Sequence, residues 1–117
     1  MIILGIDPGY ERLGIAIIRK EKGSKEELVF SECFKTLKQD DFGTRLEQIG
    51  RRIEDVIKEY SPQVLAIETL FMETNQKTVM HVSEIRGAIL YICKKAGLQI
   101  TEYTPLQVKV AITGYGK

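Results

Sequence analysis

Apolar residues form two kinds of pattern along this chain. Nearly continuous apolar runs at residues 2–6, 13–19 and 64–67 are typical of strands buried on both faces. Residues 27–37 and 98–103 predict two further strands, the first interrupted by charges. Helical spacing predicts helices from about Asp41 to Tyr60 and from Thr74 or Asn75 to Ala96, and Leu106 to Ile112 starts a third.

The two long helices carry regular apolar stripes and recognisable ends. Asp40 or Asp41 can cap the first helix, Ser61-Pro62 ends it, and Gly97 suits a left-handed cap after the second. The stripe of the first helix comprises Phe42, Leu46, Ile49, Ile53, Val56, Ile57 and Tyr60. That of the second comprises Val79, Val82, Ile85, Ile89, Ile92 and Ala96.

The connections between these elements predict the architecture. Short turns join the first three strands, which suits antiparallel pairing, whereas the later strands alternate with helices, which suits parallel crossovers. We therefore expect an α/β fold, with a mixed five-stranded sheet flanked by helices. The length of 117 residues predicts a single domain, and 44% hydrophobic with 28% charged residues fits a soluble globular protein.

Composition narrows the possible functions by exclusion. No apolar run is long enough for a transmembrane helix, and the first residues do not form a signal peptide, so we expect a cytoplasmic protein with no membrane partner. The net charge of +1 neither indicates nor excludes nucleic acid. Cys33 and Cys93 are expected to be buried free thiols. His81 is the single histidine, which disfavours a zinc site or a serine triad.

Two acids directly follow apolar strands. Asp7 comes after the first strand and Glu68 after the fourth, and the carboxyl ends of strands usually form the working cleft of an open α/β sheet. If these strands are parallel neighbours, both carboxylates can reach one hard cation, and a pair of cations can promote phosphoryl transfer. Solvated strand ends or helix caps remain the alternative. Gly9 can be an ordinary turn glycine or admit a ligand to the backbone.

The segment after Glu68 is unusually apolar for a loop. Phe71 and Met72 lie between the acid and the next helix, where an aromatic ring is either tucked into the core or exposed as a platform for base stacking.

These residues together resemble the RuvC-type Holliday junction resolvases. The opening Ile3-Leu-Gly-Ile-Asp-Pro-Gly9 is similar to that family's first hairpin, although Asp-x-Gly is shared with actin-like kinases. Residues 66–75, Ala-Ile-Glu-Thr-Leu-Phe-Met-Glu-Thr-Asn, carry the more specific similarity. Arg86-Gly87 and the segments 103–109 and 114–116 continue it in order.

The resemblance implies a ribonuclease-H-like fold and a homodimeric endonuclease that nicks two strands of four-way junction DNA symmetrically. It implies a Mg²⁺ cofactor, two ions per complete site, with Mn²⁺ as a substitute, and a branch-migration motor of the RuvA–RuvB type as partner. By position, Asp7 and Glu68 match metal-binding catalytic acids and Phe71 matches a base-stacking aromatic. Asn75 and Lys109 match DNA-binding positions.

The family's paired Asp-x-x-Asp has no counterpart in this sequence. The aspartates are Asp7, Asp40, Asp41 and Asp55, none in that spacing. We therefore expect a single nuclease domain over residues 1–117 that is C-terminally truncated, lacks the C-terminal catalytic helix, and binds metal weakly and cuts poorly or not at all.

Several interpretations stay open. The chain can be a catalytically inactive module that binds branched DNA, or an actin-like sugar or acyl-group kinase. Glu11 can pair with Arg12 or help to hold a metal, and Arg86 can form a helix-surface ion pair or contact DNA or a second subunit. His81 is expected on the helix surface or at an interface.

Overall fold

Five strands form one mixed sheet, as predicted. The structure, a computed structural model, describes residues 1–9, 11–69 and 76–103. The strands lie in the order β3-β2-β1-β4-β5. They are β1 (Ile2–Asp7), β2 (Arg12–Arg19), β3 (Glu27–Lys35), β4 (Val64–Glu68) and β5 (Gln99–Tyr103).

The pairing follows the connections read from the sequence. The hairpin-linked strands β1, β2 and β3 pair antiparallel, and β1–β4 and β4–β5 pair parallel. Strand β1 is central and joins the two halves of the sheet, with β2 on one side and β4 on the other. The parallel register sets Ile6 against Ile67, so the next residue of each strand is an acid.

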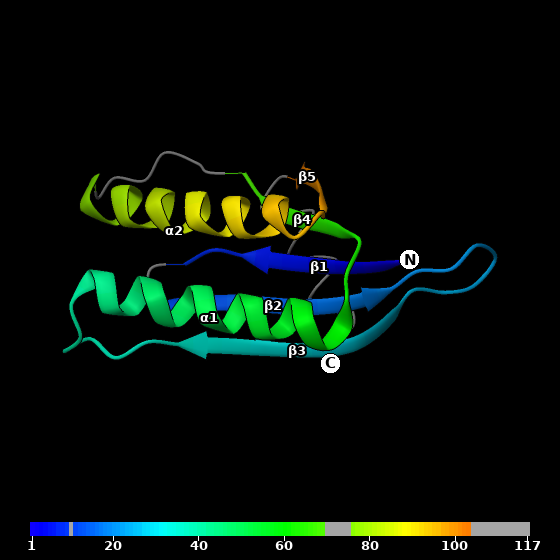
Figure 1. Ribbon diagram of the computed structural model, residues 1–117, viewed down its shortest axis with the longest axis horizontal. Coiled ribbons are helices and arrows are strands. Elements are labelled where there is room, and N and C mark those ends of the chain that lie inside the picture. The colour runs from blue at the N-terminus through cyan, green and yellow to red at the C-terminus, as the bar shows by residue number, and fades with distance from the viewer. Residues whose placement is uncertain (10, 70–75, 104–117) are drawn as a thin grey trace.

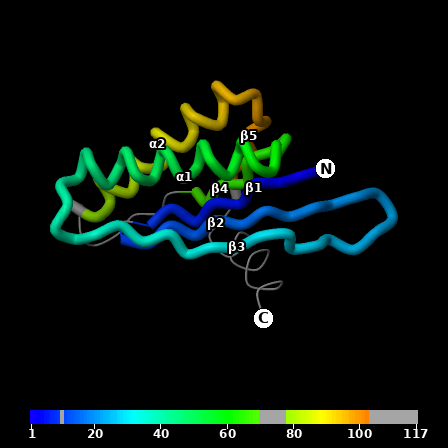
Figure 2. Tube along the Cα trace, turned by 60° about the horizontal axis from the view of Figure 1, so that its bottom comes forward, coloured from blue at the N-terminus to red at the C-terminus, as the bar shows by residue number. Residues whose placement is uncertain are grey.

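Two long helices cover one face of the sheet. Helix α1 (Phe42–Tyr60) and helix α2 (Gln76–Lys95) lie side by side on the same side of the strands (Figures 1 and 2). Within the described ranges, neither is long and apolar enough to cross a membrane.

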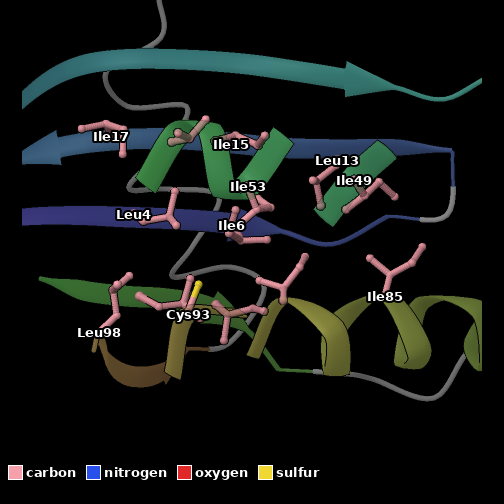
Figure 3. Packing of buried hydrophobic residues seen from close by; sticks show 14 residues of the cluster. Leu4, Ile6, Leu13, Ile15, Ile17, Ile49, Ile53, Ile85, Cys93 and Leu98 are labelled. Atoms are coloured by element: carbon pink, nitrogen blue, oxygen red, sulfur yellow. The ribbon is translucent and has the colours of Figure 1, made fainter. Parts of the chain in front are cut away.

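The core lies between these helices and the sheet. Alternate residues of the strands point toward the helices and meet the buried stripes of α1 and α2 (Figure 3). Ile49, Ile53 and Val56 come from α1, and Ile85, Ile89 and Cys93 from α2. Burial raises the pKa of the Cys93 thiol to about 12, so this thiol stays neutral inside the core.

The helix ends use the residues that the sequence indicated. The side chain of Asp41 accepts a 2.7 Å hydrogen bond from the backbone N–H of Thr44, and Ser61 ends α1 in a left-handed conformation. Gly97 adopts φ +89°, and the N–H groups of Gly97 and Leu98 bond back into the last turn of α2.

Three details differ from the sequence predictions. The third strand ends at Lys35, two residues earlier than expected. Ala96 is exposed, and Cys93 takes the buried position because steps of four from Ile85 keep that face inward. Cys33 is free as expected but exposed, because it lies on the edge strand β3. The predicted helix 106–112 lies outside the described residues.

Candidate active site

Asp7 and Glu68 lie side by side at one end of the sheet. Each is the last residue of its strand, β1 and β4, and these strands are parallel neighbours. The β1–β4 ladder ends with the pair Ile6 and Ile67, and one further residue on each strand brings Asp7 level with Glu68. Adjacent strands are about 4.8 Å apart, so both carboxylates are within reach of one ion. The two strands are therefore the parallel neighbours that a shared metal site requires, which the sequence alone could not establish.

Both side chains point away from the two helices. Leu4, Ile6, Leu65 and Ile67 belong to the core beneath α1 and α2. Because successive side chains of a strand alternate between faces, Asp7 and Glu68 belong to the opposite face. Both residues are half-buried. The carboxylates therefore share a face of the sheet that neither α1 nor α2 covers.

Gly14 makes room beside Asp7. It is the direct cross-strand partner of Asp7 in the β1–β2 ladder. A Cβ atom at Gly14 would lie only 3.2 Å from the Cβ of Asp7, which is tighter than an ordinary contact. On the far side of Gly14, its β3 partner is the exposed Cys33. Glycine at this position thus leaves space next to the carboxylate.

Glu68 is held at the junction of three elements. Its Oε2 atom is buried, and its backbone carbonyl accepts a 3.1 Å hydrogen bond from Nε of Arg86 on α2. The Nη2 atom of the same guanidinium lies 2.8 Å from Oε2 of Glu102 on β5, an ion pair that is not aligned as a hydrogen bond. Arg86 therefore ties α2 to the ends of β4 and β5.

The loop after Asp7 is shaped by Gly9. A Cβ at Gly9 would fall 2.2 Å from the carbonyl oxygen of Arg12, so any side chain there would force the backbone apart. This contact supports the turn-glycine interpretation. Glu11 is exposed and pairs with Lys38 at 3.5 Å rather than with Arg12, so the predicted Glu11–Arg12 pair is wrong.

The two acids fit a hard divalent cation. Carboxylate oxygens are the ligands that Mg²⁺ and Mn²⁺ prefer, and Mg²⁺ commonly uses one or two protein carboxylates with water and phosphate oxygens. Across the described ranges, no cluster of three or more His, Cys, Asp or Glu side chains could hold a metal ion. The described donor set is therefore these two carboxylates.

Cationic side chains lie at the same end of the sheet. Arg12 comes two residues before Gly14 on β2, and its cross-strand partner on β3 is Lys35. Both are exposed, and alternation puts them on the face that carries Asp7. Like charges directly opposite each other destabilise a strand pair slightly, so their positions suit an anion outside the sheet.

The comparisons with known proteins identify the family. The family model described as "Crossover junction endodeoxyribonuclease RuvC" matches residues 3–117. The chain belongs to this family. It is 44% identical over 117 residues to the protein of that name from Alkaliphilus metalliredigens, and 41% identical to the one from Petrotoga mobilis. Both alignments cover 100% of this chain and 71% of the relative.

A solved RuvC structure has the same fold. The RuvC of T. thermophilus in complex with a Holliday junction substrate superposes with a TM-score of 0.84 at 30% identity. The match covers 97% of this chain and 72% of that one. The ribonuclease-H-like fold expected from the resemblance is confirmed, and family membership removes the kinase interpretation.

Three RuvC-family positions named from the sequence fall outside the described residues. Phe71, Asn75 and Lys109 lie in the ranges 70–75 and 104–117, so the structure does not test their roles. The roles of Asp7 and Glu68 as metal ligands also stay predictions, although their positions agree with that role.

Sequence reasoning missed two neighbours of the acids. Gly14 was noted only as part of the hairpin resemblance, although its place opposite Asp7 follows from the two-residue alternation of the hairpin. Arg86 was considered as a surface ion pair, yet its side chain is only 15% exposed and contacts the end of β4. The sequence feature that could have pointed to Arg86 is its position directly after the core residue Ile85.

His81 lies between the two helices rather than on the open surface. Its side chain is 18% exposed, and its ring lies 4.1 Å from that of Phe42, measured between centroids.

Proposed function

We propose that this chain is a structure-selective endonuclease that resolves four-way DNA junctions, in recombination and repair, by symmetric metal-dependent nicking. The observation that carries the proposal is the placement of Asp7 and Glu68 on one face, at the carboxyl ends of adjacent parallel strands. The T. thermophilus RuvC at a TM-score of 0.84 was solved with a Holliday junction substrate, which supports the same substrate class.

In this mechanism Asp7 and Glu68 would hold Mg²⁺, two ions in a complete site, with Mn²⁺ as a substitute. The cation would supply Lewis-acid stabilisation of the charge that develops on the phosphate during attack by water. The chain's own contribution is geometric. Glu68 is fixed through its backbone by Arg86, and Gly14 leaves Asp7 free to turn toward the phosphate. Cleavage leaves a 5′-phosphate and a 3′-hydroxyl.

We propose that the remaining DNA contacts follow the family. Phe71 stacks on a base of the opened junction, Asn75 contacts DNA at the start of α2, and Lys109 contacts the backbone. Arg12 and Lys35, exposed on the same face as Asp7, add phosphate contacts. Because the substrate is chromosomal DNA, the chain would work in the cytoplasm.

We propose that the protein acts as a homodimer through α2. Met80 and Tyr91 are 64% and 66% exposed, and they continue one helical stripe on either side of Gly87. A Cβ at Gly87 would meet nothing within 4 Å, so a second backbone could approach there. A dimer formed through this stripe would leave the carboxylate faces of both subunits open to two strands of one junction. A motor of the RuvA–RuvB type would supply the junction.

A branched-DNA-binding module without catalysis is the second candidate. It is favoured by one observation, that the described residues bring together two carboxylates and no third ligand. Two protein ligands are expected to bind metal weakly, and we predict that the 117-residue chain cuts poorly or not at all.

A band-shift with four-way and linear DNA, with nicking scored in the same samples with and without Mg²⁺, tests the proposal. We expect a clear preference for the junction, and any slow nicking should require the metal and disappear in Asp7→Asn. Junction binding without nicks favours the binding module. Equal affinity for both DNAs, or nicking that survives Asp7→Asn, contradicts the junction-nuclease assignment.

A further inference from the structure

We propose that Arg86 is a positioning residue for the Glu68 carboxylate, an inference that rests on the proposed metal site. Arg86 sits on α2, on the helix-covered side of the sheet, whereas alternation puts the Glu68 side chain on the other side. Arg86 contacts the main chain of Glu68, so it acts on the carboxylate through the backbone.

The contacts of Arg86 make it a clamp. Its Nε atom donates to the Glu68 carbonyl at 3.1 Å, and its Nη2 atom lies 2.8 Å from the Glu102 carboxylate. The Arg86 side chain is 15% exposed and that of Glu102 is 54% exposed. The planar guanidinium can reach two partners at once, which the single ammonium of lysine cannot do in the same geometry.

The clamp acts where β4 stops pairing with β1, although Glu68 still pairs with Tyr103 of β5 on its other side. Glu68 is the last residue of β4, and the β1–β4 ladder ends one residue before it, at the Ile6–Ile67 pair. Arg86 supplies an additional hydrogen bond to the Glu68 carbonyl at that point. Fixing the peptide group that contains the Glu68 carbonyl restricts the orientation of the Glu68 side chain. The carboxylate is thereby kept on the side of the strand that faces Asp7.

Outer-shell partners of metal ligands have measurable effects on metal binding. Losing one typically lowers metal affinity or activity about 10- to 100-fold, because the ligand must then be ordered on binding. We expect Arg86→Lys to weaken Mn²⁺ binding by about 10-fold. Glu102→Gln keeps the hydrogen bond from Arg86 to Glu68 but weakens the ion pair that holds the guanidinium. We therefore expect this substitution to lower Mn²⁺ affinity as well, but by less than Arg86→Lys.

Arg52→Lys is a matched control. Arg52 also reaches from a helix, α1, to a strand, and its Nε lies 2.7 Å from Oε1 of Glu32, with side chains 29% and 31% exposed. Both substitutions remove an arginine contact between a helix and the sheet. Arg52 contacts β3, whereas Arg86 contacts the carboxyl ends of β4 and β5.

The experiment measures three quantities on the full chain and these variants. Urea unfolding gives stability, water-proton relaxation gives the Mn²⁺ dissociation constant, and the Glu68 carboxyl ¹³C resonance, assigned with Glu68→Gln, reports its environment without metal. We expect Arg86→Lys to move the Glu68 resonance and weaken Mn²⁺ binding, whereas Arg52→Lys changes stability alone.

The outcomes separate the two ideas. If the parent chain binds Mn²⁺ and Arg86→Lys changes only stability, with Mn²⁺ affinity and the Glu68 resonance as in the parent, the clamp is purely structural and the inference is wrong. If the parent chain binds no Mn²⁺, the proposed metal site fails. The Glu68 resonance then still decides whether Arg86 positions this carboxyl: a shift supports the clamp and an unchanged resonance refutes it.

Discussion

At the scale of single residues, the site depends on space as much as on charge. Asp7 faces Gly14 across the β1–β2 ladder, and the 3.2 Å separation from an added Cβ leaves no room for a methyl group without movement. Glycine costs strand stability through its conformational entropy. Its presence opposite an acid therefore points to a packing requirement at that position.

Gly14→Ala should weaken metal binding without unfolding the protein. The added methyl crowds Asp7 from the β2 side and displaces its carboxylate from the position shown here, and we expect the Mn²⁺ dissociation constant to rise by about 10-fold, as for other losses of ligand support. Gly43→Ala is the control, because an added Cβ there meets only an ordinary 3.8 Å contact. An alanine at Gly14 that leaves Mn²⁺ affinity unchanged would show that Asp7 does not need this space.

At the scale of elements, helix α1 is started by a charged cap. Hydrogen bonds from Thr44 to the Asp41 carboxylate, first from the Thr44 side chain and then from its backbone N–H, lower the pKa of this carboxyl below its ordinary value of 3.8. A lowered pKa means that the ionised form is stabilised by folding. The contribution is therefore fully present above the unfolded-state pKa and is lost as the pH falls through the folded-state pKa.

We accordingly expect Asp41→Ala to lower the free energy of unfolding at about pH 6 and to have a smaller effect below about pH 3. Asp41→Asn should retain capping and show a weaker pH dependence, because its amide does not ionise. Urea unfolding at the two pH values measures this. An alanine penalty that stays constant between them would mean that the charge of Asp41 does not contribute.

Strand and helix patterns predicted every element that the structure describes, with small differences in where the elements begin and end. The apolar run before Asp7 and the stripe from Phe42 to Tyr60 carry enough periodicity to specify an element by themselves. The adjacency of Asp7 and Glu68 could not be predicted this way, because 60 residues lie between these two acids and sheet order is a tertiary property. The role of Arg86 depends on two partners from different strands, which periodicity does not encode.

At the scale of the whole molecule, a near-neutral chain must bind a highly charged polymer. The formal net charge is +1, so affinity for DNA has to come from where the cations lie. Arg12 and Lys35 lie opposite each other on the face and at the end of the sheet that carry Asp7. A local concentration of positive charge there would hold phosphates beside the acids.

Replacing both cations, Arg12→Gln with Lys35→Gln, should reduce the salt dependence of junction binding. Each phosphate contact contributes about 0.9 to the slope of log K against log salt concentration, so the slope should fall by about 2. Lys22→Gln with Lys25→Gln removes the same charge from the turn at the other end of β2 and β3 (Figure 1). If the two double variants change the slope equally, the net charge of the chain determines the salt dependence, and the position of Arg12 and Lys35 does not.

The central claim is that Asp7 and Glu68 share one divalent cation, and ¹H–¹⁵N NMR with added Mn²⁺ tests it most directly. A bound paramagnetic ion broadens nearby amides whether or not the chain cuts DNA. The amides of Asp7, Gly14 and Glu68 should broaden first, those of Ile2 and Val64 at the opposite ends of β1 and β4 should broaden later and less, and Asp7→Asn should abolish the effect. Broadening centred on another part of the molecule, or unchanged in Asp7→Asn, would contradict the claim.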